Sequence, residues 1–156
     1  YLVDHGYPKS SVGLLWSLGV VCEIGVFLWM PRLLHKYSLR RVLLASFALA
    51  VARFLMIGWG VRSAALVAAA QVLHAATFGA YHSAAVEVVH RFFRGRHQSK
   101  GQALYNSLSF GAGGTLGGLY AGSTWDALGP QWTFTLAAAS ALVGLGLLYW
   151  KLRLRE

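Results

Sequence analysis

The feature that most constrains the fold is a series of five apolar runs, each about 20 residues long, separated by short polar segments. A helix needs about 20 residues to cross the hydrocarbon core of a bilayer. Only 12% of the 156 residues are charged, against about 25% in a typical soluble domain. The sequence therefore predicts an all-α, polytopic bundle of transmembrane helices in a lipid bilayer, with spans at about 11–30, 42–59, 64–89, 101–122 and 132–150.

The ends of the first span carry clear local signals. Residues 1–10 form a polar loop, and Ser10 or Ser11 is a candidate N-cap, because its hydroxyl can accept from an N–H of the first turn. Pro31 follows the apolar run. It is expected to end the span, because proline lacks the N–H that a helix interior requires.

The basic residues lie mainly between the spans and in the tail, and the chain has a formal net charge of +9. Such residues mark the cytoplasmic side of a membrane protein. We therefore expect both basic loops and the C-terminus in the cytoplasm and Tyr1 outside, which requires at least one further span before Tyr1. No segment resembles a groove-reading module, so nucleic acid is not expected as a partner. The residues concerned are Arg32, Lys36, Arg40, Arg41, Arg91, Arg94, Arg96, Lys100, Lys151, Arg153 and Arg155.

Two charges, Glu23 and Arg53, lie deep inside predicted spans. A charge at mid-bilayer costs about 2.5–3.5 kcal/mol on insertion scales. Opposite charges on adjacent spans are therefore expected to pair, directly or through water or a substrate. Counting from the span ends puts them at levels that differ by roughly 8 Å at 1.5 Å per residue, a gap that long side chains can close. His74 of the third span lies near the same level.

Residues 71–82, QVLHAATFGAYH, place a polar and aromatic stripe within the third apolar span. Residues three and four apart share one face of a helix. The members of the stripe should therefore lie on one side, which faces protein or a water-filled cavity and not lipid. They are Gln71, His74, Phe78, Tyr81 and His82.

Two interpretations of Glu23, Arg53 and His74 stay open. One is a structural ion pair with a hydrogen-bonded histidine, and the other is a cluster that handles protons and substrate beside a central cavity. The second is favoured because a buried ion pair stabilises a protein little relative to apolar residues. Gaining or losing a cation beside a carboxyl group changes its proton affinity, which couples proton movement to conformation.

The fourth span is rich in glycine, with small residues repeated four apart. This pattern lets neighbouring helix backbones approach closely, so it predicts tight helix packing. Asn106 is expected to add polar lining toward the cytoplasmic half of the same span. The glycine pairs are Gly113/Gly117, Gly114/Gly118 and Gly118/Gly122.

The remaining ionisable residues predict only local roles. Cys22 is the only cysteine, which excludes a disulfide within the chain and a cysteine-based metal site. The histidine pairs 74/82 and 90/97 lack the spacing of metal ligands, and no nucleophile–base pair is evident. Glu87 is expected to pair with Arg91, one turn later. We expect no cofactor, no metal and no enzymatic activity.

Two of these patterns together resemble a known superfamily. Residues 32–44, RLLHKYSLRRVLL, join two spans with a basic pattern, and Glu23, Arg53 and His74 follow one another on successive spans. The chain resembles the C-terminal half of a major facilitator superfamily transporter, with Ser38 in place of a usual glycine in the loop between helices 8 and 9. The resemblance implies that residues 1–156 are a C-terminal transmembrane half-domain, helices 8 to 12, whose partner is the N-terminal half of the same protein.

The series Glu23, Arg53 and His74 is similar to the lactose permease group, in which an acid, an arginine and a histidine on these helices form the binding and proton-coupling cluster. In that group a lysine precedes the histidine by three positions and a glutamate follows it by three. Gln71 and Thr77 occupy those positions here. The sugar permeases' coupling carboxylate is thus missing, and Glu23 is the better candidate to carry the proton.

The third pattern is HRFFRGRHQSKGQALYNSLSFGAGGTLGGLYAG at 90–122, followed by WDALGPQWTF at 125–134. It resembles the phenylpropionate permease family, over essentially all of residues 1–155. The resemblance implies proton-coupled uptake of an aromatic acid such as 3-phenylpropionate across a bacterial inner membrane. Arg53 would then hold the substrate carboxylate, and Phe78 and Tyr81 would meet its ring.

The predicted protein is a multi-pass secondary transporter of the bacterial inner membrane that takes up a small aromatic carboxylic acid with protons, at a site near the midplane. One alternative is a transporter of neutral solutes, such as sugars or nucleosides, from the same superfamily. Another is a non-transporting membrane scaffold or sensor, whose polar residues only join helices. The predicted proton-coupling residues are Glu23, Arg53 and His74; the predicted substrate-binding residues are Arg53, Gln71, His74, Phe78, Tyr81 and Asn106.

Overall fold

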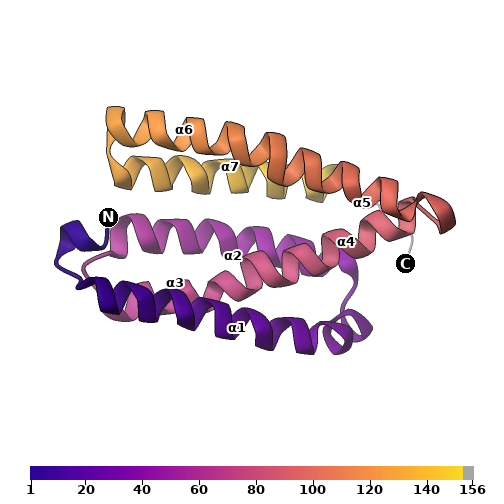
Figure 1. Cartoon of the computed structure of the whole chain (residues 1–156), viewed down its shortest axis with the longest axis horizontal. Coiled ribbons are helices and arrows are strands. Elements are labelled where there is room, and N and C mark those ends of the chain that lie inside the picture. Colours follow the sequence, from indigo (N-terminus) through magenta and orange to yellow (C-terminus); the bar gives the residue numbers. More distant parts are fainter. Residues whose placement is uncertain (153–156) are drawn as a thin grey trace.

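Long helices running side by side make up the computed structural model, which describes residues 1–152 (Figure 1). The described residues contain helices and turns but no strand, so the predicted all-α fold is confirmed. Two of the helical segments contain a π-helical turn, a stretch of i→i+5 hydrogen bonding. The elements are η1 Val3–His5, α1 Lys9–Lys36, α2 Leu39–Gly60, α3 Ala64–His74, the π-turn η2 Ala75–Ala80, α4 Tyr81–Phe92, η3 Gly95–His97, α5 Gln98–Asn106, the π-turn η4 Ser107–Ala112, α6 Gly113–Leu128 and α7 Pro130–Lys151.

Four helices of the described chain are long and apolar enough to cross a membrane. They are α1, α2, the continuous segment Ala64–Phe92 formed by α3, η2 and α4, and α7. The fifth predicted span, 101–122, lies inside the helical segment 98–128 but is not among the four. Its glycines and polar side chains lower its hydropathy below that of the others.

The first helix is longer than the sequence predicted at both ends. Pro8 is its N-cap, not Ser10 or Ser11, and the helix begins at Lys9. It also continues through Pro31 to Lys36, where the N–H of Tyr37 donates to the carbonyl of Leu33. A membrane helix tolerates an internal proline when local adjustment satisfies the backbone group that the proline frees. The prediction that Pro31 ends the helix was therefore wrong.

Serine caps set the starts of the next two helices. The Ser38 side chain accepts a hydrogen bond from the N–H of Arg41 at 3.3 Å, and Ser63 accepts one from Leu66 at 3.4 Å. Each satisfies an N–H of the first turn that has no partner within the helix. The short connections that these caps close reverse the chain direction, so α1, α2 and α3 run antiparallel in succession (Figure 1).

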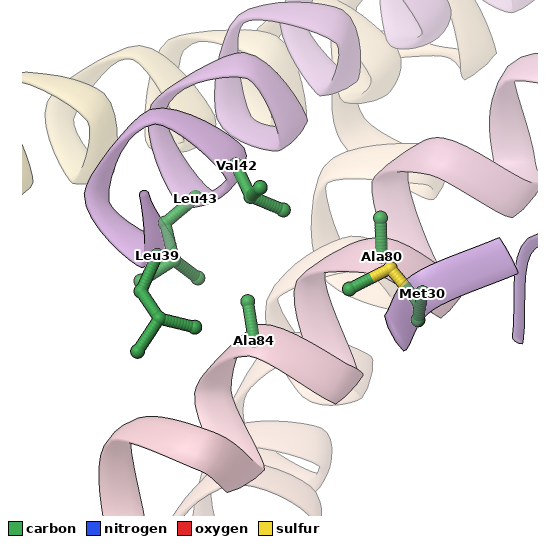
Figure 2. Packing of buried hydrophobic residues seen from close by; sticks show 6 residues of the cluster. All are labelled: Met30, Leu39, Val42, Leu43, Ala80 and Ala84. Atoms are coloured by element: carbon green, nitrogen blue, oxygen red, sulfur yellow. The ribbon is translucent and has the colours of Figure 1, made fainter. Parts of the chain in front are cut away.

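Helix α2 is central to the packing. It lies along α7 on one side and against α3, η2 and α4 on the other, while α1 packs on α3 and η2. In Figure 1, α6 and α7 lie along one side of the bundle, α1 lies along the other, and α2 and α4 lie between them. The main hydrophobic cluster, shown in Figure 2, joins α1, α2 and the η2–α4 segment; it consists of Met30, Leu39, Val42, Leu43, Ala80 and Ala84.

The glycine-rich helix α6 is not the tightly packed helix that the sequence predicted. None of its residues is buried, and a Cβ built at Gly114, Gly117, Gly118 or Gly122 would meet nothing within 4 Å. These four glycines therefore make no close helix contact within the described chain. Close helix contacts occur instead at isolated glycines of other helices, among them Gly58.

We expect Gly58→Ala to destabilise the α2–α7 contact. A Cβ at this position would lie 2.9 Å from the Cβ of Phe134 and 3.3 Å from the carbonyl oxygen of Gln131, both of α7. Overpacking of this kind costs about 1–3 kcal/mol, and backbone atoms cannot move aside as a flexible side chain can. Gly146→Ala is the matched control, because it makes the same change at a helical position where the added Cβ would meet no atom within 4 Å. Thermal unfolding in detergent should give a lower Tm for Gly58→Ala than for Gly146→Ala; equal values would contradict the packing described.

Candidate functional site

A cavity of about 550 Å³ lies among α2, the α3–η2–α4 segment, α6 and α7. This volume is within the range of small-molecule sites, about 300–1,000 Å³. The lining is mainly aromatic and aliphatic, with one guanidinium and several hydroxyl groups. The lining residues are Ser46, Phe47, Ala50, Arg53, Phe54, His74, Thr77, Phe78, Tyr81, Gly117, Tyr120, Ala121, Thr133, Ala137, Ser140 and Ala141.

Within residues 1–152, Arg53 is the one Lys, Arg, Asp or Glu residue that lines this cavity. Its Nη1 donates to the Thr77 hydroxyl over a long 3.4 Å, and its Nε is buried with no hydrogen-bond partner in the described part of the chain. Its Cζ lies 5.5 Å from the centre of the Phe54 ring. A guanidinium has five N–H donors in a planar fork that matches a carboxylate. Most of that capacity is unused here.

Glu23 approaches the same region from α1 and meets His74. Its Oε2 lies 3.8 Å from Nε2 of His74, and the two side chains are 15% and 28% exposed, respectively. Gly79 admits the carboxylate side chain, since a Cβ there would lie 3.2 Å from Cγ of Glu23. Gly19 of α1 leaves room for the Gln71 side chain in the same way, since a Cβ at Gly19 would lie 3.4 Å from Oε1 of Gln71. Two glycines thus set the close approach of α1 to α3 and η2.

The direct Glu23–Arg53 pair that the charges suggested is not among the ion pairs of residues 1–152. Glu23 faces His74 and Arg53 faces Thr77. The sequence predicted only the levels of Glu23 and Arg53 along their helices. The direction of the Glu23 side chain depends also on how α1 packs against α3 and η2. His74 joins the two groups, because it lines the cavity and also meets Glu23.

The stripe of residues 71–82 divides between two sides of its helix. His74, Phe78 and Tyr81 line the cavity, as does Arg53 from α2. Gln71 instead packs against Gly19 of α1. Tyr81 is held edge-on to Phe47, with the two ring centres 5.6 Å apart.

An aromatic column runs beside the cavity. The rings of His74 and Phe78 stack at 5.5 Å and those of Phe78 and His82 at 6.1 Å, with interplanar angles of 9° and 7°. His82 Nδ1 lies 3.3 Å from the Tyr105 hydroxyl, and Phe110 lies edge-on to Phe78. The column joins η2 to α5 and η4, so the two π-helical turns meet through aromatic rings.

Asn106 lies outside the cavity. It is exposed on α5 and accepts a hydrogen bond from Gln102 Nε2 at 3.2 Å. Glu87 pairs with Arg91 at 3.2 Å, which confirms the predicted interfacial contact. The described residues contain no group of three or more His, Cys, Asp or Glu side chains that could hold a metal.

The sequence reasoning missed part of the lining. Phe47 and Phe54 of α2 and Thr133, Ala137 and Ser140 of α7 face the cavity. On α2, Phe47 and Phe54 lie six positions before and one position after Arg53, so the spacing of three or four residues that marks a shared helical face does not find them. On α7 no charged residue lies within the apolar run, so the sequence gives little indication of which face of this helix lines the cavity.

Comparison with known proteins assigns the chain to a family. Residues 1–136 match the MFS_1-like family. The chain is 32% identical over 148 residues to the "Probable 3-phenylpropionic acid transporter" of Escherichia coli (strain K12). That alignment covers 91% of this chain and 38% of the relative, so the chain spans well under half of the relative's length. No solved structure matches the chain significantly. The chain belongs to the MFS_1-like family, among the transporters of the major facilitator superfamily, and not to a family of enzymes.

Proposed function

We propose that this chain is the C-terminal half-domain of a secondary transporter that takes up a small aromatic carboxylate together with a proton. The observation that carries the proposal is Arg53, a guanidinium with unused donors that lines a cavity whose other large side chains are mostly aromatic. A carboxylate pairs with the guanidinium fork. Phe47, Phe54 and Phe78 offer faces and edges to a substrate ring. The name of the Escherichia coli relative supports the same class of substrate.

Glu23 and His74 are the proposed proton-handling pair. Their side chains lie 3.8 Å apart where α1 packs on α3. His74 also lines the cavity, so a bound anion beside Arg53 changes the charge that Glu23 and His74 experience. This arrangement supports coupling of a proton to the substrate anion. Gln71 is proposed to fix the position of the pair through its contact at Gly19, and Asn106 to contribute where an N-terminal half faces α5.

The proposed location is the bacterial inner membrane, with the basic end of the bundle in the cytoplasm. The α1–α2 and α4–α5 connections lie at one end of the bundle (Figure 1), and most of the basic residues lie in them or on the adjoining ends of the helices. At this end Arg40 links α2 to the C-terminal end of α7, since its Nε and Nη2 donate to the carbonyls of Leu152 and Tyr149 at 3.0 and 2.8 Å. Clustered positive charge supports a cytoplasmic assignment. Arg153 and Arg155 of the predicted basic tail lie outside the described residues.

A neutral solute is the second candidate. The hydroxyls of Ser46, Thr77, Thr133 and Ser140 also belong to cavity residues, and they would suit a sugar or nucleoside. All four already donate to backbone carbonyls: Ser46 to Ala76, Thr77 to His74, Thr133 to Gly129 and Ser140 to Leu136. The hydroxyl groups are therefore largely occupied within the helices, whereas the guanidinium is not. This contrast favours the anion.

Uptake by the intact transporter in proteoliposomes tests the proposal. The panel is 3-phenylpropionate, benzoate, the neutral analogue 3-phenylpropanol, lactose and uridine, each with and without an inward proton gradient. We expect gradient-dependent accumulation of the two carboxylates, abolished by a protonophore, and none of the three neutral compounds. Accumulation of lactose or uridine alone would establish the second candidate, and failure to move any small anion or solute would favour a scaffold or sensor.

A further inference from the structure

The corner between α1 and α2 holds a concave basic pocket away from the proposed substrate site. It has a volume of about 350 Å³ and is lined by residues 34–39 together with Arg41 and Arg91. Lys36, Arg41 and Arg91 bring three permanent cations to it, and His35 adds an ionisable group. Glu87 is the only carboxylate in ion-pair contact with any of these within the described chain, through Nε of Arg91. The pocket therefore has a surplus of positive charge.

The side chains of Arg40 and its neighbour Arg41 differ in their hydrogen bonding. The Arg40 guanidinium is committed to the carbonyls at the end of α7. Arg41 makes no side-chain hydrogen bond or ion pair within residues 1–152, and it is exposed. The pocket also lies at the N-terminus of α2, where the helix dipole favours an anion. Pocket, dipole and uncommitted cation together point to a negatively charged group.

An apolar groove adjoins this basic pocket and shares Tyr37 and Arg41 with it. The groove has a volume of about 430 Å³ and is almost entirely apolar. Along α2 it covers residues 42–49, a length of about 10 Å at 1.5 Å per residue. The Ser46 hydroxyl donates to the carbonyl of Ala76 at 3.0 Å, so the one polar side chain in the middle of the groove is already satisfied. Its lining is Leu33, Tyr37, Arg41, Val42, Ala45, Ser46, Leu49, Ala76 and Ala80.

We propose that the basic pocket and the apolar groove form one binding site for an anionic glycerophospholipid. The phosphate and its headgroup occupy the pocket beside Lys36, Arg41 and Arg91, and the first part of an acyl chain lies in the groove between α1, α2 and η2. A small soluble anion would use only the pocket, and an uncharged lipid would use only the groove. The basic pocket and the apolar groove meet at the end of two membrane helices, which corresponds to the headgroup layer of a bilayer. Together they select a molecule that has both an anionic headgroup and an acyl chain.

Binding to the intact, delipidated protein in mild detergent, followed by native mass spectrometry, tests the site. The probes are dioleoyl phosphatidylglycerol, dioleoyl phosphatidylethanolamine and glycerol 3-phosphate. We expect phosphatidylglycerol to bind several-fold more tightly than phosphatidylethanolamine, and glycerol 3-phosphate to bind much more weakly than either. Glycerol 3-phosphate binding as tightly as phosphatidylglycerol would overturn the lipid assignment in favour of a free-phosphate site, and the absence of any preference for the anionic lipid would overturn the proposal.

Variants separate a built site from general electrostatic attraction. The pair Arg41→Gln/Arg91→Gln should lower the affinity for phosphatidylglycerol about tenfold, because two cations leave the pocket. The matched pair Arg32→Gln/Arg96→Gln removes the same charge from the same end of the bundle at residues that do not line the pocket. It should bind as the parent protein does.

Ala45→Trp provides a third measurement that leaves the charge unchanged. Ala45 is exposed and lines the groove, so an indole there fills the space for the acyl chain with little demand on the core. We expect a loss of phosphatidylglycerol affinity of several-fold with an unchanged Tm. Equal losses in the two charge pairs, or full affinity in Ala45→Trp, would contradict the site.

Discussion

Replacing Arg53 with glutamine is expected to abolish uptake of aromatic carboxylates at low substrate concentration and to weaken their binding about 30- to 1,000-fold. Truncating one partner of a buried, hydrogen-bonded charge pair costs about 2–4 kcal/mol. Among the described residues Arg53 is the only permanent cation that lines the cavity, and its Nε has no hydrogen-bond partner there. No neighbouring group can therefore replace it. Affinity measured by quenching of intrinsic tryptophan fluorescence in the intact transporter, together with uptake, gives the readout.

Three comparisons make the Arg53 experiment specific. Arg53→Lys keeps the charge but loses the planar fork, so it should retain an intermediate affinity. Arg62→Gln removes an arginine from the turn after α2, away from the cavity lining, and should bind substrate normally. Binding of 3-phenylpropanol, which has no carboxylate, should be equally weak with and without Arg53. An Arg53→Gln protein that binds 3-phenylpropionate as well as the parent protein would rule out the anion assignment.

The bundle was readily predicted from the sequence because hydropathy and helix length are local properties. Five apolar runs became five helical segments, and Ser38 and Ser63 cap two of them as serine chemistry allows. The prediction of a helix end at Pro31 was wrong for a physical reason. Proline lowers helix stability in water, but a helix in a membrane has no alternative partner for its backbone groups and so continues through it.

The candidate site was only partly predictable, because rotation about each helix axis depends on contacts that no single helix contains. Arg53, His74, Phe78 and Tyr81 line one cavity. Gln71 turns toward α1 because Gly19 leaves room for it there. The π-helical turn at 75–80 also alters the rotational register between residues before and after it, which the 3.6-residue period does not anticipate.

The largest change in coupling is expected from Glu23→Gln, which should stop accumulation of substrate against its gradient while leaving exchange across the membrane intact. Among the carboxylates in the described helices, Glu23 alone lies far from a helix end, and its side chain is only 15% exposed. Glutamine has nearly the same volume and remains polar, but its amide cannot bind and release a proton. The 3.8 Å contact with His74 then loses its charge, and substrate movement no longer requires a proton. The accumulation ratio in proteoliposomes should fall to about 1, and the pH dependence of exchange should flatten.

Glu87→Gln is the matched control for this uncoupling. Glu87 is the carboxylate near the end of α4, half-exposed and paired with Arg91, so its loss should leave accumulation unchanged. Counterflow of labelled 3-phenylpropionate shows whether Glu23→Gln still folds and binds, because counterflow needs no net proton movement. His74→Asn separates the two members of the pair. If Glu23 carries the proton, Glu23→Gln loses accumulation. If His74 carries it instead, His74→Asn will lose accumulation while Glu23→Gln keeps it, and this result would contradict the assignment to Glu23.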